Sequence, residues 1–135
     1  MRRTLLLAVT TAVVLLASGC GGGSEVEVGV GDGAATVTTG DTLRVDLGAA
    51  NPSVGDSWHL IGPPDPAVLT DRGDDYTADC DMPGCGGSLA WRFAAAGKGQ
   101  TTLVFRYCYR SGPDDCQPAP DRGPATPVAL TVTVG

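Results

Sequence analysis

Short runs of alternating apolar and polar residues constrain the fold of this chain more than any other feature. An alternation of period two is typical of β-strands with one buried face, and turn signals rich in Gly, Pro and Asp separate the runs. The 20 glycines and 10 prolines in 135 residues also disfavour a helical bundle. Strands are expected at residues 36–39, 42–47, 57–61, 68–69, 89–93, 100–109 and 128–134. This spacing predicts an all-β fold, a two-sheet antiparallel β-sandwich of about seven strands.

The core of such a sandwich must be small, because aromatic residues make up only 5% of the chain. The expected anchors are Trp58, Trp91, Phe93, Phe105 and Tyr107. A large apolar side chain contributes roughly 1.5–3 kcal/mol when it is fully buried, so a core of this size is marginal. Disulfides worth roughly 2–4 kcal/mol each would then matter for stability.

The first 20 residues are typical of an export signal. Arg2 and Arg3 precede an uncharged, mostly apolar stretch at residues 4–17, which is too short for a good transmembrane helix. The stretch ends in Ala17-Ser18-Gly19-Cys20, which resembles the bacterial lipobox. The resemblance implies that residues 1–19 are a lipoprotein signal peptide and that Cys20 is lipidated. The protein would then be exported and lipid-anchored to the outer face of the bacterial cell membrane. An ordinary signal peptide with a chance cysteine is the alternative.

A glycine-rich segment follows the lipidated cysteine. Residues 20–33 predict a flexible tether between the lipid and a folded domain at residues 34–135. Part of the Glu-Val-Glu-Val stretch at residues 25–28 could still pair as an edge strand.

The charge balance and the single histidine exclude several classes of function. The chain has 9 basic and 15 acidic residues, a formal net charge of −6, so nucleic acid is not an expected partner. His59 is the one histidine, which excludes a multi-His metal site and leaves little for acid–base catalysis. We therefore expect no enzymatic activity, no metal and no cofactor. The aspartates at residues 71–81 could suggest Ca²⁺, but their spacing is not that of an EF-hand and favours a solvated loop.

Four cysteines remain once Cys20 carries the lipid. An even number in an exported protein favours two disulfides, and the spacing does not fit paired Cys-x-x-Cys metal ligands. The four residues are Cys80, Cys85, Cys108 and Cys116. Three pairings are possible, and the sequence alone does not choose among them. We favour local pairing, Cys80 with Cys85 and Cys108 with Cys116, because it closes two short loops of functional interest.

Three loops between the expected strands carry the candidate functional residues. They are Asn51-Pro52-Ser53-Val54-Gly55, Gly84-Cys85-Gly86-Gly87 and Tyr109-Arg110-Ser111-Gly112-Pro113. In the first, Pro fixes φ and Gly permits a positive φ, which is turn chemistry. The glycines of the second indicate a tight turn or a close approach of backbone to another group. Each loop alone could be structural only.

In this order and on this strand pattern, the loops resemble the chagasin family of cysteine-protease inhibitors. Residues 40–58 match a segment in which Gly-Asp and alternating apolar residues lead to Asn-Pro-Ser-x-Gly and then Trp58. Residues 84–87 match a Gly-x-x-Gly turn before an aromatic strand, and residues 96–110 match a strand that ends at Arg110. The resemblance covers roughly residues 38–134. It implies an immunoglobulin-like sandwich whose three loops plug the active-site cleft of a papain-like cysteine protease, with the first loop nearest the catalytic cysteine.

Two departures from the family pattern bear on the site. Asp56 stands where the family has an aromatic residue, and the third loop lacks the usual Trp, so that Tyr109 and Arg110 are the expected anchors. Inhibition would act by occlusion, because the sequence offers no nucleophile–base pair. We expect a monomer whose partner is a papain-like cysteine protease. The departures favour the alternative, a non-inhibitory immunoglobulin-like binding module for another envelope or secreted protein. A purely structural lipid-anchored domain is a third possibility.

Overall fold

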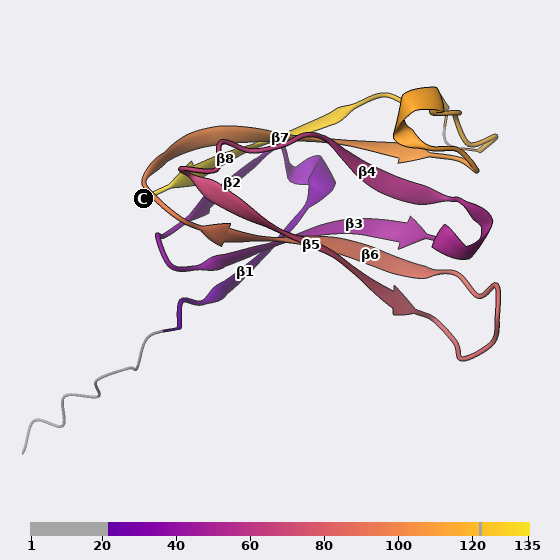
Figure 1. The fold of residues 1–135 in the computed structure, drawn as a ribbon, viewed down its shortest axis with the longest axis horizontal. Helices are drawn as coiled ribbons and strands as arrows, with labels where there is room; N and C mark the ends of the chain where they lie inside the picture. The colour runs from indigo at the N-terminus through magenta and orange to yellow at the C-terminus, as the bar shows by residue number, and fades with distance from the viewer. Residues whose placement is uncertain (1–21, 122) are drawn as a thin grey trace, which may run out of the picture.

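The computed structural model describes residues 22–121 and 123–135. They form two four-stranded sheets that pack face to face, with strand orders β1-β3-β6-β5 and β2-β8-β7-β4 (Figure 1). The strands are β1 (Glu25–Gly29), β2 (Ala34–Val37), β3 (Thr42–Ala50), β4 (Ser57–Gly62), β5 (Leu69–Ala78), β6 (Gly87–Ala95), β7 (Gly99–Cys108) and β8 (Val128–Val134). Short 3₁₀ turns follow at η1 (Val30–Asp32), η2 (Pro52–Val54) and η3 (Pro113–Asp115). The all-β sandwich predicted from the alternation is confirmed.

The alternating side chains build the core between the two sheets. In β3, Leu43, Val45 and Leu47 are buried while the residues between them face outward. Phe93 of β6 and Phe105 of β7 are fully buried, with their ring centroids 6.4 Å apart in an edge-to-face arrangement. This contact joins the central strands of the two sheets, because β6 and β7 belong to different sheets.

The domain begins earlier in the chain than the sequence analysis places it. Strand β1 lies within residues 20–33, the segment assigned to the tether, and pairs in parallel with β3 so that Glu25 lies beside Thr42. The pairing starts at Ser24, whose carbonyl accepts a hydrogen bond from the amide of Thr42 (2.9 Å). The edge strand that the sequence allowed at residues 25–28 is therefore present. Strand β2 also pairs in parallel, with β8, so the sandwich is not antiparallel throughout.

Strand β5 is the largest departure from the expected strands. The sequence predicts a strand only at residues 68–69 and a solvated loop after it, but β5 runs for ten residues to Ala78. Its aspartates are compatible with a strand because β5 is the outer strand of its sheet. Asp71 accepts a hydrogen bond from the indole of Trp91 (2.7 Å), and Asp75 pairs with Arg92. The hydrogen bond that the guanidinium of Arg92 donates to Asp75 is the main cause that raises the pKa of Arg92 above its ordinary value.

The predicted signal peptide at residues 1–19 and the predicted lipidation site Cys20 lie outside the described residues. Within residues 22–121 and 123–135, no helix is long and apolar enough to cross a membrane.

Candidate functional site

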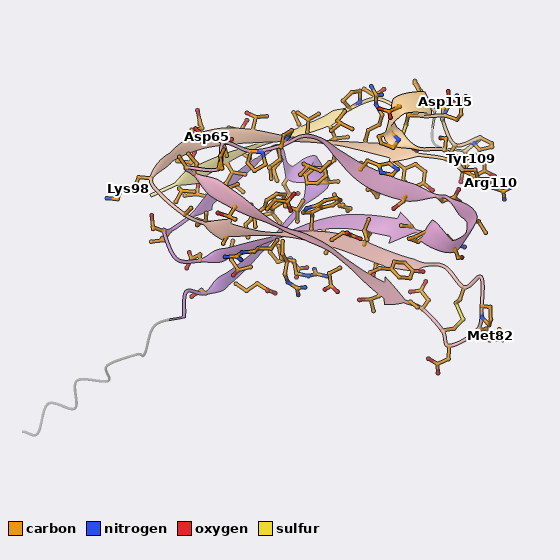
Figure 2. All side chains as sticks on the ribbon, in the orientation of Figure 1. Asp65, Met82, Lys98, Tyr109, Arg110 and Asp115 are labelled. Carbon is orange, nitrogen blue, oxygen red and sulfur yellow. A yellow bond between two sulfur atoms is a disulfide. The ribbon has the colours of Figure 1, made fainter. Side chains whose placement is uncertain are left out.

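The three predicted loops lie at the same end of the sandwich (Figure 1). The first loop (residues 51–56) joins β3 to β4, the second loop (residues 79–86) joins β5 to β6, and the third loop (residues 109–116) follows β7. Figure 2 shows Met82 of the second loop and Arg110 of the third loop at this end, with Lys98 at the opposite end. We call these three loops together the loop edge.

The first loop is closed at its base and held by hydrogen bonds along its length. Asn51 and Asp56 face each other as an isolated β-bridge, with backbone N–H···O distances of 2.8 and 3.1 Å. Between them, Pro52–Val54 form a 3₁₀ turn, and Gly55 adopts a left-handed conformation with φ of 89°. The hydroxyl of Ser53 donates to the side-chain oxygen of Asn51 (2.5 Å). The turn chemistry expected for this loop is what the structure contains.

The second loop is closed by a disulfide between Cys80 and Cys85, which is the local pairing that the sequence analysis favours. The hydroxyl of Tyr76 on β5 donates to the carbonyl of Cys85 (3.1 Å) and fixes the end of the loop on the sheet. Met82 at its tip is 73% exposed, although methionine is an apolar residue. The loop therefore presents one apolar side chain from a cross-linked frame.

The third loop is closed by the other local disulfide, between Cys108 and Cys116. Its two sides are joined by a hydrogen bond from the amide of Tyr109 to the carbonyl of Gln117 (2.9 Å). The hydroxyl of Ser111 accepts from the amide of Gln117 (2.8 Å), which fixes the turn internally. The guanidinium of Arg110 lies over the ring of Tyr109, 5.0 Å from its centroid. The two expected anchors thus form one stacked pair.

Side chains of the first loop connect it to both neighbours. The side-chain amide of Asn51 donates to the carbonyl of Gly84 in the second loop (3.1 Å). On the other side, the carboxylate of Asp56 accepts from the backbone amide of Arg110 in the third loop (3.1 Å). A Cβ atom added to Gly55 would lie only 3.2 Å from the Cα of Arg110, so the first and third loops are in close contact. The loop edge is one connected structure.

The exposed face of the loop edge is apolar at two points and acidic on its flanks. Val54 is 44% exposed, and with Met82 it provides two of the three exposed large hydrophobic side chains found among the described residues. The acidic flank consists of exposed aspartates of the second and third loops: Asp79, Asp81, Asp114 and Asp115. Such a face is suited to binding a groove in another protein, because apolar anchors surrounded by polar groups are typical of interfaces.

Two residues of the loop edge were not among the candidates from the sequence. Met82 could have been found, because it is the one large apolar residue in the short segment between Cys80 and Cys85. The role of Asp56 could not have been predicted from the sequence, because its partner Arg110 is 54 positions away and nothing in the local sequence indicates the interaction.

The described residues offer little for catalysis. His59, on β4, is half-buried and its Nε2 has no hydrogen-bond partner among them. In the same part of the chain, no three His, Cys, Asp or Glu side chains are grouped to hold a metal ion.

Comparisons with known proteins find similarity to one family and to solved structures of the same fold. Residues 36–121 match the family described as "Chagasin family peptidase inhibitor I42". No curated protein sequence matches the chain. Among solved structures, Amebosin in solution has a TM-score of 0.58 at 19% identity, over 84% of this chain and 100% of Amebosin. The crystal structure of the cysteine protease inhibitor EhICP2 from Entamoeba histolytica has a TM-score of 0.58 at 17% identity, over 83% of this chain and 96% of EhICP2. These likenesses show the fold.

Proposed function

Because the chain belongs to the chagasin family of peptidase inhibitors, we propose that it inhibits papain-like cysteine proteases by filling their active-site cleft with the loop edge. Proteins of this family are inhibitors and not enzymes. The proposal depends most on one observation, which is that Asn51 and Asp56 connect the first loop to both neighbours. A connected edge can enter a groove without losing much conformational freedom.

The rigidity of the loop edge has an energetic consequence for binding. Ordering a flexible side chain at an interface costs roughly 0.5–1.5 kcal/mol, and ordering a loop costs more. Here the disulfides and the bonds between loops impose that order before the partner arrives. More of the free energy of contact is then available for affinity.

The chemistry of inhibition is occlusion. Val54, at the centre of the edge, would occupy the cleft nearest the catalytic cysteine, with Met82 on one side and the stacked pair of Tyr109 and Arg110 on the other. Occlusion forms no covalent bond between the loop edge and the protease. Tyr109 and Arg110 take the place of the Trp that the family uses as an anchor.

We further propose that the protein is an exported lipoprotein anchored through Cys20 to the outer face of the bacterial cell membrane. Supporting this, the described chain starts at the end of the sandwich opposite the loop edge (Figure 1). A lipid two residues before Gly22 would therefore leave the loops directed away from the membrane. The unsubstituted protein should incorporate a labelled fatty acid supplied to the cells, and Cys20→Ser should abolish this incorporation. Absence of label from the unsubstituted protein would contradict lipidation.

The inhibition is tested by titrating papain with the disulfide-bonded protein. Papain is first activated with thiol and then freed of it, so that the disulfides of the inhibitor stay intact. We expect competitive inhibition of peptide hydrolysis at submicromolar concentration, because interfaces of this class commonly bind more tightly than 1 μM. Val54→Asp should weaken it at least tenfold, because a charge would enter a desolvated contact. Lys98→Ala, at the opposite end, is the control and should have no effect.

A second candidate function is a non-inhibitory binding module for another envelope or secreted protein. The absence of a Trp from the third loop favours it. No inhibition of papain at micromolar concentration, with the protein folded, would favour this second function over the first.

A further inference from the structure

We propose that Asp56 is a positioning residue that holds the third loop in its binding conformation. This inference rests on the proposed function, since it concerns how the loop edge meets a protease. Asp56 closes the first loop through its backbone bridge to Asn51. Its carboxylate acts on the third loop through the backbone amide of Arg110.

The backbone of Arg110 needs such support. Its φ of 48° makes it the one non-glycine residue with a positive φ among the described residues. This left-handed conformation is unfavourable for a residue with a side chain and persists only where the surroundings impose it. A hydrogen bond from the amide of Arg110 to a charged carboxylate is stronger than one to a neutral acceptor. The carboxylate of Asp56 therefore favours the conformation that directs the Arg110 side chain over Tyr109.

The position of the carboxylate is itself fixed. Asp56 is bridged through its backbone to Asn51, and its neighbour Gly55 leaves the space that the backbone of Arg110 occupies. Asp56 is half-buried and takes part in none of the ion pairs found among the described residues, which are Arg44–Glu27, Arg92–Glu25 and Arg92–Asp75. Its carboxylate is thus available to the third loop and is not committed to a neighbouring cation.

Other restraints act at the base of the third loop and within it. Pairing of Cys108 with Ser57 fixes the base beside β4, and the disulfide of Cys108 and the hydrogen bonds of Ser111 and Gln117 close the loop on itself. Among the described residues, the bond to Asp56 is the one hydrogen bond that joins the body of the third loop to the first loop. Without this bond, the third loop stays folded as a unit but can move relative to the first loop. Tyr109 and Arg110 are then no longer held in the position in which they contact the protease.

The test compares Asp56→Ala, Asp56→Asn and the control Asp74→Ala in the disulfide-bonded protein without the predicted signal peptide. Asn keeps an oxygen acceptor in nearly the same place, whereas Ala removes it. Asp74 is an exposed acid of β5 outside the loop edge, so its replacement makes the same change in charge without touching the bond. Two quantities are measured: amide hydrogen exchange at Arg110 by NMR, and the rates of association with and dissociation from papain.

We expect Asp56→Ala to speed exchange at Arg110 and to raise the dissociation rate about tenfold, with little change in the association rate. Asp56→Asn should restore both quantities to within about threefold of the unsubstituted protein. Asp74→Ala should change neither exchange at Arg110 nor dissociation. If Asp56 had a purely structural role, Asp56→Ala would lower the melting temperature together with the affinity. Melting temperatures of the variants that stay close to that of the unsubstituted protein therefore support a positioning role.

Unchanged exchange at Arg110 in Asp56→Ala would overturn the inference, and so would faster exchange with unchanged dissociation. If Asp56→Ala does not fold, weaker binding by a folded Asp56→Asn variant with intact exchange protection would also overturn it. If the unsubstituted protein does not inhibit papain, the proposed function fails. The exchange measurement then decides alone whether Asp56 holds the third loop.

Discussion

Gly55 supports the loop edge in two ways, through its left-handed backbone and through the space it leaves for Arg110. Replacement of Gly55 by Ala, compared with a matched control, should separate these two contributions. Its φ of 89° is left-handed, and an L-residue with a Cβ pays roughly 1–2 kcal/mol there. The added Cβ would also lie 3.2 Å from the Cα of Arg110, which is tighter than ordinary van der Waals contact with a backbone that is fixed by hydrogen bonds. We expect the third loop to be displaced and the dissociation constant for papain to rise by more than about tenfold, or about 1.4 kcal/mol.

The matched control is Gly40→Ala. Gly40 has a φ of 94°, but a Cβ there would meet nothing within 4 Å. Both variants carry the same backbone penalty, so Gly55→Ala should lose at least as much free energy of unfolding, measured with urea, as Gly40→Ala. Only Gly55→Ala should lose affinity, measured by titration of papain. Equal affinities for the two variants would refute the argument that the first and third loops touch in the binding state.

Two further predictions follow from the second loop and from the acidic flank. Replacement of both Cys80 and Cys85 by Ser should lower the free energy of unfolding by about 2 kcal/mol, because the disulfide no longer reduces the entropy of this short loop in the unfolded chain. The same variant should dissociate faster from papain, and unchanged binding would show that the second loop needs no cross-link. The association rate constant with a protease, measured by stopped flow, should depend on ionic strength because of the acidic flank. Replacement of Asp81, Asp114 and Asp115 by Asn should weaken that dependence. A rate constant that does not vary with salt in the unsubstituted protein would contradict a role for these charges.

The fold could be predicted from the sequence wherever one face of a strand is buried. In β3 and β7 the alternation is strong because their inner side chains, such as Leu43 and Phe105, fill the core. Strand β5 could not be predicted in the same way. It is an outer strand with aspartates at Asp71, Asp74 and Asp75, and acidic residues are depleted in strands, so the pattern favoured a loop. Its pairing with β6 decides its conformation.

In the candidate site, too, some features could be predicted from the sequence and others could not. The composition of the loops is local information, and it identified the turn at Asn51 and the glycines before β6. The contacts that connect the loops are not local. The partners of Asn51 and Asp56 lie 33 and 54 positions away, and nothing in the neighbourhood of either residue distinguishes a cross-loop bond from an ordinary polar turn. Long-range hydrogen bonds of this kind become visible only when the topology has placed the three strand ends together.

The parallel pairing of β1 with β3 has a mechanical consequence. Strand β1 starts at the end opposite the loop edge and runs toward it, beside β3 from Thr42 to Asp46. Tension between Gly22 and a protease held at the loops would act along the strand axis. The hydrogen bonds between these two strands would then bear the load together, in shear, instead of breaking one at a time. A sheet resists force applied in this direction more than force that peels its strands apart.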